Sequence, residues 1–456
     1  MIFKRKIYSQ LLAWKQNFDG RSAVMIQGAR RVGKSTVVEE FAKNEYKSYI
    51  LVDFNIADDE LLGIFYDIKS DMNLFFNRLQ LNRHVQLYER ESVIIFDEVQ
   101  DFPFAREMIK YLVKDHRYDY IETGSLISVK ARSASIKIPS EEHRLDMYPM
   151  DFEEWLWANG DDFSMDLLHE FFVKKQPLGD NTHSALMRRY REYMVVGGMP
   201  QVVEAYLRKH SVFDAELIKK EILKLYQEDI NKSPDSIRVR SLNLYNRVPA
   251  MLSSPHKILS PTKIEKGTRR RDYETSLEWL CDAMLLNRCR CNPDPDLALG
   301  LNEDPRRVKC YFLDTGLLIS FAFGKEPSVV EDVYDQLLDG NLSINQGMFF
   351  ENAVAQQLVT LGRDLWFTEF GQDRSGKKYE VDFLLSVACK MVPIEVKSSK
   401  STIHHSLDAL LEKYPSRIGQ AYVVHTGDLR FDGKITYLPI YMLPFILERR
   451  DVQKSE

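Results

Sequence analysis

One stretch near the N-terminus constrains the fold of this chain more than any other. It reads Gly28-Ala29-Arg30-Arg31-Val32-Gly33-Lys34-Ser35 and fills every fixed position of the pattern G-x-x-x-x-G-K-[ST]. An apolar run at residues 23–26 precedes it and predicts a buried strand, and residues 36–42 after it predict a helix. The order strand, loop, helix is the setting in which this pattern forms a phosphate-binding loop.

The chemistry of the loop predicts a nucleoside triphosphate and a divalent cation. Its glycines let the backbone wrap closely round phosphates, and the N–H groups at a helix N-terminus favour negative charge. Lys34 would reach the β- and γ-phosphates, and Ser35 would offer a hydroxyl to Mg²⁺, with Thr36 as a possible substitute. We therefore expect residues 28–36 to bind ATP with Mg²⁺. The alternative is a Gly-rich turn that binds nothing.

A second motif, which is acidic, supports the phosphate-binding loop. Residues 92–98 form an apolar run that ends in Asp97 and Glu98, where a buried parallel strand would reach its C-terminal edge. We expect Asp97 to hold Mg²⁺, directly or through water, and Glu98 to orient and polarise the attacking water. A strand followed by a solvated acidic turn is the alternative. The two motifs corroborate each other because both belong at the same sheet edge.

A third segment brings hydroxyl groups to that edge. Residues 119–122 predict a strand, and Thr123-Gly124-Ser125 follows it. Thr123 could hydrogen-bond the γ-phosphate or the attacking water, although a Ser/Thr turn that caps the next helix is an ordinary alternative. Together with a strand at residues 48–54, the alternation of strands and helices predicts an α/β core with a parallel sheet covered on both faces.

Composition limits the remaining classes. A chain of 456 residues with 44% hydrophobic residues is too long for one core, and we expect three. A net charge of −5 excludes a uniformly basic chain but allows a local basic surface. The five cysteines form no C-x-x-C pair, which favours reduced thiols without zinc. The absence of a long apolar run or signal peptide predicts a cytoplasmic protein that makes no membrane contact.

Three segments together resemble a known family. Residues 28–36, 94–100 and 123–125 look like the AAA+-type P-loop ATPases of bacteria and archaea that carry a C-terminal domain of unknown function. By this resemblance Glu98 is the catalytic glutamate and Thr123 is the sensor residue. The family's Gly-Arg pair corresponds here to His143-Arg144, ahead of residues 149–154. Arg144 is therefore a candidate to stabilise transition-state charge, in cis or from a neighbouring subunit, and an ordinary surface arginine is the alternative.

The middle of the chain predicts two helical modules. Residues 152–232 have a helical pattern with one sharp break at Gly197-Gly198-Met199-Pro200, which we interpret as a turn within a lid. Residues 241–312 have the order helix, turn, helix, strand, loop, strand, which fits a winged helix. Arginines 269–271, with Arg306, Arg307 and Lys309 on the wing, could contact DNA phosphates. Solvated charge or a protein contact remains the alternative.

The C-terminal part carries a possible nuclease motif. Strands at residues 379–385 and 392–397 would place Asp382, Glu395 and Lys397 on neighbouring strands, and Glu351 on a helix could complete a Mg²⁺ ligand set. Asp382 and Glu395-Val396-Lys397 resemble the PD-(D/E)xK nuclease superfamily, in which Lys397 would position or deprotonate water. The alternative is a salt-bridged relic in a domain that only binds nucleic acid or a partner.

These patterns combine into one expected organisation. It comprises an AAA+/RecA-like ATPase core at residues 1–152, a helical lid at 153–235, a winged-helix-like module at 236–325 and a restriction-endonuclease-like α/β domain at 326–456. The expected function is Mg²⁺-dependent ATP hydrolysis that acts on or senses DNA or another nucleic acid. The alternative is an ATP-driven regulatory switch with an inert C-terminal domain and a protein partner or a second copy of the chain.

Overall fold

A computed structural model describes residues 1–125, 140–323, 327–340, 346–372, 376, 378–387 and 389–447. By its internal contacts the chain divides into two compact units. The first comprises residues 1–148 with the short segments 232–236 and 282–284, and the second comprises the remainder. Each unit is described by itself.

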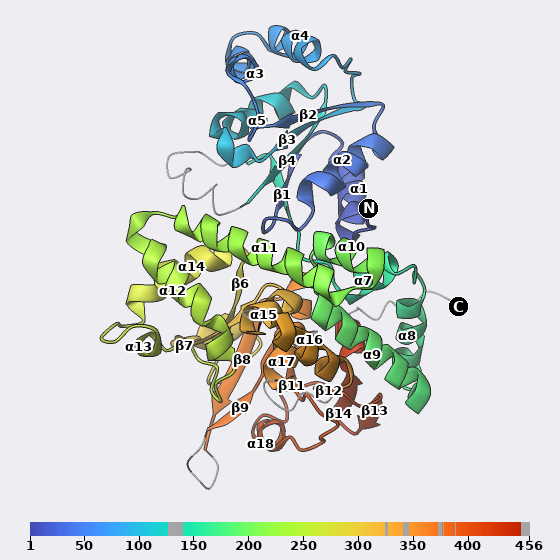
Figure 1. The fold of residues 1–456 in the computed structure, drawn as a ribbon, viewed down its shortest axis with the longest axis vertical. Helices are drawn as coiled ribbons and strands as arrows, with labels where there is room; N and C mark the ends of the chain where they lie inside the picture. The colour runs from blue at the N-terminus through green and yellow to red at the C-terminus, as the bar shows by residue number, and fades with distance from the viewer. Residues whose placement is uncertain are drawn as a thin grey trace. The chain divides into compact units, whose positions relative to one another are not determined.

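The first unit is an α/β unit (Figure 1). Its elements in chain order are α1 (Lys6–Phe18), β1 (Ala23–Gln27), α2 (Lys34–Glu45), β2 (Ser48–Asp53), α3 (Asp59–Ile64), η1 (Phe65–Lys69), α4 (Met72–Arg83), β3 (Ser92–Asp97), η2 (Val99–Asp101), α5 (Pro103–Asp115), β4 (Asp119–Gly124) and β5 (Glu142–Asp146). The strands pair in the order β2-β3-β4-β1-β5, and every pairing is parallel. The predicted parallel sheet is confirmed.

Strand order decides which loops meet. Because all five strands run the same way, their C-terminal ends share one edge of the sheet. Strand β4 lies between β1 and β3, so its end at Thr123 and Gly124 lies between the loop after Gln27 and the turn after Asp97. Three motifs far apart in the sequence are therefore neighbours at this edge.

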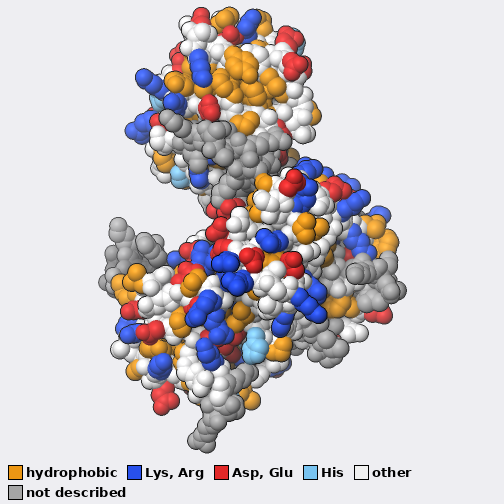
Figure 2. Space-filling view, turned by 90° about the vertical axis from the view of Figure 1, so that its left-hand side faces the viewer, with side chains coloured by type: hydrophobic (Ala, Val, Ile, Leu, Met, Phe, Trp, Pro, Cys, Tyr) orange, Lys and Arg blue, Asp and Glu red, His pale blue; other side chains and the backbone are white. Residues whose placement is uncertain are grey.

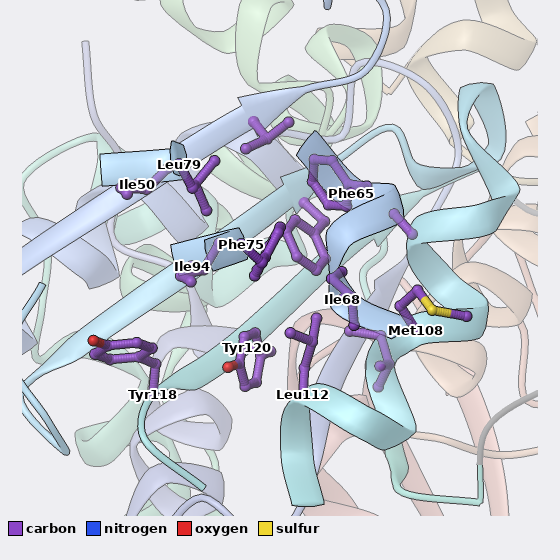
Figure 3. Close-up of a cluster of buried hydrophobic side chains, with 14 of the residues drawn as sticks. Ile50, Phe65, Ile68, Phe75, Leu79, Ile94, Met108, Leu112, Tyr118 and Tyr120 are labelled. Atoms are coloured by element: carbon purple, nitrogen blue, oxygen red, sulfur yellow. The ribbon is translucent and has the colours of Figure 1, made fainter. Parts of the chain in front are cut away.

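One face of this sheet packs on a large aromatic core. Side chains of α3, η1, α4 and α5 meet those of β2, β3 and β4, as Figure 3 shows for Phe65, Phe75, Ile94 and Tyr120. Phe75 is fully buried, and burial of such a side chain stabilises the fold by roughly 1.5–3 kcal/mol. Helices α1 and α2 lie against the opposite face (Figure 1). The sheet is thus a rigid base for its edge loops.

The second unit combines a helical layer with two mixed sheets. Its helices are α7 (Phe152–Ala158), α8 (Ser164–Val173), α9 (Asp180–Val196), α10 (Pro200–Lys209), α11 (Val212–Asn231), α12 (Asp235–Leu252), α13 (Pro261–Ile264), α14 (Arg271–Asp282), η3 (Leu299–Asn302), α15 (Thr315–Phe323), α16 (Pro327–Leu338), α17 (Gln346–Thr360), α18 (His405–Lys413) and η4 (Ile440–Ile446). Its strands are β6 (Leu286–Cys291), β7 (Asp304–Phe312), β8 (Leu365–Phe370), β9 (Tyr379–Val381), β10 (Phe383–Val387), β11 (Lys390–Val396), β12 (Ala421–His425), β13 (Arg430–Asp432) and β14 (Ile435–Pro439).

One sheet crosses a predicted domain boundary. Its order is β7-β6-β8-β9, and β6 pairs in parallel with β8 through Cys289 and Leu365. The modules predicted at residues 236–325 and 326–456 therefore share backbone hydrogen bonds within one compact unit. The second sheet, in the order β10-β11-β12-β14-β13, lies wholly in the C-terminal part.

The predicted element order of the middle module is present. Helices α12, α13 and α14 precede the antiparallel strands β6 and β7, and Ile258 forms an isolated bridge with Lys309 on β7. These elements follow the order helix, turn, helix, strand, loop, strand. That they form a DNA-binding winged helix remains a prediction.

The break at residues 197–200 is a tight turn. Helix α9 ends at Val196, Gly197 has a φ of 85°, and Pro200 begins α10. A side chain at Gly198 would overlap the Met150 backbone, and the Gly198 N–H donates to Asp314 at 2.7 Å. The glycines are needed because two backbone segments cross here in close contact.

Candidate functional site: a phosphate-binding loop and an acidic sheet edge

The loop between β1 and α2 has the backbone geometry that its glycines allow. Gly33 is the N-cap of α2 with a φ of 98°, and a Cβ at Gly28 would lie 2.5 Å from the Met147 carbonyl oxygen. Gly33 has no side chain to cap α2, so no side chain covers this helix N-terminus from the N-cap position. Such an end is suited to an anion.

Two long side chains hold the loop in shape. The Lys34 ammonium is buried and donates to the carbonyl oxygens of Gly28 at 3.0 Å and Ala29 at 3.2 Å. Arg5 donates to the Val32 carbonyl oxygen at 2.8 Å from outside the loop. Burial lowers the pKa of Lys34, although the charges of Glu98 and Asp97 oppose that shift. The loop is closed around the lysine that would meet the phosphates.

The remaining loop residues differ in how exposed their side chains are. Ala29 and Val32 are buried, Arg30 is half-buried, and Arg31 and Thr36 are exposed. Ser35 is half-buried and is the hydroxyl that reaches the acidic edge, so Thr36 is not its substitute in this structure.

Asp97 joins the loop to the neighbouring strands. Its Oδ1 accepts hydrogen bonds from Ser35 Oγ at 2.8 Å and from Thr123 Oγ1. Burial raises the pKa of Asp97, and the hydrogen bonds from Thr123 and Ser35 counter part of that shift. A hydroxyl and a carboxylate within hydrogen-bonding distance are oxygen ligands that one Mg²⁺ can share with a nucleotide. The residues therefore fit the ATP and Mg²⁺ that the loop predicts.

Glu98 has a supporting residue that sequence reasoning left without a role. Glu98 lies in the left-handed region with a φ of 54°, and its N–H donates to Thr123 Oγ1 at 3.3 Å. Its carboxylate accepts a hydrogen bond from Gln100 Nε2. Gln100 stands two residues after Glu98, within the stretch 94–100 on which the family resemblance rests, so the sequence contained the signal. The left-handed turn brings the two side chains together.

Arg144 occupies a different environment from the other predicted site residues. It lies on β5 opposite Met25 of β1, its side chain is 45% exposed, and its Nε donates to Glu142 Oε1 at 2.8 Å. Within this chain its guanidinium bonds to a carboxylate. A role in trans on another copy stays a prediction.

A group of buried charged side chains on α5, β4 and β5 was not predicted from the sequence. Arg106 of α5 makes two hydrogen bonds of 2.9 Å to Glu142 of β5, and Glu122 of β4 is buried near them. Neither carboxylate oxygen of Glu122 has a hydrogen-bond partner among the described residues. Burial, followed by the charge of Glu142, raises the pKa of Glu122 well above its usual range. Burial and the charge of Glu142 therefore favour the protonated form of the Glu122 carboxyl in the folded protein.

The predicted C-terminal residues do come together, in the second unit. Asp382 Oδ2 accepts from the Val396 N–H at 2.8 Å, and Lys397 Nζ lies 2.8 Å from Glu395 Oε1. Glu351 of α17 is joined to Asp382 through Lys309, which contacts both carboxylates. Together they form an acidic cluster between the first half of α17 and the C-terminal ends of β9 and β11.

This acidic cluster contains cations that sequence reasoning did not place there. Lys309 of β7 and Lys257 both form ion pairs with Glu351, and Lys309 also pairs with Glu380. Burial would raise the pKa of Glu351, but Lys309 and Lys257 lower it to about 2. Burial and the charges of Glu351 and Glu395 raise the pKa of Asp382 well above its usual range. Glu351 and Glu395, two of the predicted metal ligands, therefore already have ammonium partners.

No set of three or more His, Cys, Asp or Glu side chains in the described part of the chain is placed to hold a metal ion. All five cysteines are free thiols. Across the same described residues, no helix combines the length and the apolar character needed to cross a membrane.

Some basic residues of the middle module are exposed, and others are buried or form ion pairs. Arg271 and Arg306 are exposed, at 76% and 85% of their side chains. Arg307 pairs with Glu369, and Lys309 is fully buried, so the wing contact predicted for Lys309 is wrong because its side chain points into the acidic cluster. Figure 2 shows Lys and Arg side chains gathered on one face of the second unit, with Asp and Glu among them.

Comparison with known families classifies part of the chain. Residues 20–156 match the family model of an AAA domain. Residues 187–328 and 346–443 each match a model described only as a domain of unknown function. No curated protein matches the chain. The loop, the acidic strand and the parallel sheet all lie within the stretch that matches the AAA domain model.

Solved structures give distant likenesses. The Walker-type ATPase of Pyrococcus abyssi is 16% identical, with a TM-score of 0.40, over 72% of this chain and 96% of that chain. Cdc6p of Pyrobaculum aerophilum is 11% identical with a TM-score of 0.27, over 74% and 97% of the two chains. Drosophila ORC bound to DNA is 10% identical with a TM-score of 0.28, over 67% and 91%. Because these TM-scores lie below 0.5, the classification rests on the AAA domain match.

Proposed function

We propose that the first unit hydrolyses ATP with Mg²⁺. The observation that carries this proposal is the hydrogen bond of 2.8 Å between Ser35 Oγ and Asp97 Oδ1. It brings the last residue of the phosphate-binding pattern to the carboxylate that ends β3. Both side chains offer oxygen atoms of the kind that Mg²⁺ takes as ligands, beside a loop suited to phosphates.

The roles of the residues follow from their positions. The N–H groups at the start of α2 and the Lys34 ammonium bind the β- and γ-phosphates. Mg²⁺, when bound, neutralises charge that develops on the phosphates, and Ser35 and Asp97 would hold it. Glu98 accepts a hydrogen bond from the attacking water and polarises it, while Thr123 fixes the Glu98 backbone.

The variant Glu98→Gln tests the catalytic assignment. It keeps the size of the side chain but removes the charge that polarises water, so turnover should fall by about 10²-fold or more while ATP still binds. Phosphate release and equilibrium binding of a fluorescent ATP analogue measure the two quantities. Asp101→Asn removes an exposed carboxylate three residues on and is the matched control. Normal turnover in Glu98→Gln would show that another group activates the water.

A second candidate function is contact with nucleic acid. The exposed arginines that favour it are Arg269 and Arg271 at the start of α14 and Arg306 on β7. Their guanidinium groups could pair with phosphates. However, α14 also carries Asp272, Glu274, Glu278 and Asp282, which weakens a major-groove role for the helix itself.

Salt-dependent binding to duplex DNA tests this candidate. If Arg269 and Arg271 each contact a phosphate, the double substitution to alanine should weaken binding and reduce the log–log salt slope by about two. Fluorescence anisotropy at several salt concentrations measures both quantities. Arg208→Ala on α10, where the arginine is 68% exposed, is the control. An unchanged slope would move the proposal toward the alternative, in which the second unit is an adaptor for a protein partner.

A further inference from the structure

The acidic cluster in the second unit has a cation at its centre. Lys309 Nζ lies 2.7 Å from Glu380 Oε1, 3.3 Å from Glu351 Oε1 and 3.9 Å from Asp382 Oδ1. Its side chain is 0% exposed. Lys257 is a second ammonium group on Glu351. The carboxylates expected to bind a metal therefore surround a lysine.

This lysine is fixed by backbone pairing. Lys309 stands opposite Cys289 in the β6–β7 pairing, and Ile258 bridges to it from the other side. Its ammonium lies 4.8 Å from the centre of the Phe367 ring on β8. The side chain thus crosses the face of the sheet from β7 toward β9, where Glu380 lies.

The geometry leaves no place for a divalent cation among the same oxygens. Mg²⁺ requires oxygen ligands at about 2.0–2.1 Å in an octahedral arrangement. An ammonium group about 3 Å from those oxygens would lie in contact with the ion, where like charges repel each other strongly because little water screens them. Glu351 is further occupied by a hydrogen bond from the Tyr311 hydroxyl.

We infer that Lys309 takes the place of a divalent cation, so that the acidic cluster is a buried ionic junction between β7 and residues 346–443 rather than a metal site. The lysine of the PD-(D/E)xK-like motif is part of the same arrangement, because Lys397 pairs with Glu395. Among the described residues, Glu395 Oε2 is buried without a hydrogen-bond partner. It is therefore a single oxygen available to a cation, and one oxygen does not make a set of metal ligands.

Removal of Lys309 should convert the junction into a cation site. The substitution Lys309→Met keeps much of the side-chain volume but leaves four carboxylates, Glu351, Glu380, Asp382 and Glu395, against two remaining lysines. An unpaired buried charge is strongly destabilising. A divalent cation should then bind to the variant and raise its melting temperature. Lys309→Arg keeps the charge and is the matched control.

The experiment measures Mn²⁺ binding to the full chain without nucleotide. We expect the wild type, Lys309→Arg and Asp382→Asn to bind the same number of Mn²⁺ ions, and Lys309→Met to bind about one more and to melt at a higher temperature when Mn²⁺ is present. The additional ion should be lost again in the double variant Lys309→Met, Asp382→Asn.

Two results would overturn the inference. If the wild type binds one more Mn²⁺ than Asp382→Asn, the lysine does not exclude the metal. If Lys309→Met folds but gains neither an ion nor a Mn²⁺-dependent melting shift, Lys309 does not stand in for a cation. Should Lys309→Met not fold, the comparison of the wild type with Asp382→Asn decides the question alone: equal binding supports the inference.

Discussion

At the scale of single residues, the residues of the ATP site that stand in short motifs could be predicted. The residues that hold those motifs in place from elsewhere in the chain could not. Lys34, Ser35, Asp97 and Glu98 stand in short motifs whose spacing reflects one loop and one strand end, and the structure brings them to one sheet edge. Arg5 supports the same loop from more than twenty residues away. Such a contact depends on packing that no local pattern encodes.

Gln100 offers a prediction at this scale. Its side chain donates to the Glu98 carboxylate, and a hydrogen bond to a charged group contributes about 1.5–3 kcal/mol. Gln100→Ala should therefore lower kcat for ATP hydrolysis by roughly tenfold or more while the Kd for ATP changes little, because Glu98 loses its orientation.

Steady-state kinetics and nucleotide binding separate these two quantities. Glu40→Gln, a half-buried carboxylate on α2, is a control for general perturbation of the unit. An equal loss of affinity and turnover in Gln100→Ala would point to a structural effect on the loop instead.

At the scale of elements, the parallel direction of the strands was predictable, but the choice of pairing partners was not. Apolar runs and alternation predicted a parallel sheet, which the structure confirms. The pairing of β6 with β8 joins two modules that the sequence patterns separated, because sheet partners are set by three-dimensional contact. For the same reason, Lys257 and Lys309 could not be linked to Glu351 from their sequence positions.

The interior of the first sheet gives a pH-dependent prediction. An unfolded Glu ionises near pH 4.3, whereas burial and the charge of Glu142 raise the pKa of Glu122 in the folded chain. The folded state therefore holds a proton that the unfolded state releases, and stability falls as the pH rises above about 4.3 toward the raised pKa. Glu122→Gln removes this titration.

Thermal unfolding at two pH values measures the effect. Glu122→Gln should melt close to the wild type near pH 4.5 and at a higher temperature at pH 8, by roughly 2–4 °C for each kcal/mol regained. Glu142→Gln is the contrasting variant, since it breaks the buried pair with Arg106 and should destabilise the unit by about 3–5 kcal/mol. A difference for Glu122→Gln that is the same at both pH values would contradict a raised pKa of Glu122.

At the scale of the whole molecule, the sequence predicted the chemistry of the first unit in more detail than that of the second. The first contains motifs that tie sequence to chemistry directly, and it matches an AAA domain. The second contains a nuclease-like spacing of Asp382, Glu395 and Lys397, yet the cations around those carboxylates come from other parts of the chain. Short motifs report which side chains are present but not what neutralises them.

The rate of phosphate release from ATP by the full chain in Mg²⁺, compared with that of Lys34→Ala, tests most directly whether the first unit hydrolyses ATP. Lys34 holds the loop through Gly28 and Ala29 and would contact the phosphates. We expect Mg²⁺-dependent turnover in the wild type that falls by about 10²-fold or more in Lys34→Ala. Equal rates in the two proteins, with both folded, would contradict ATP hydrolysis at this loop.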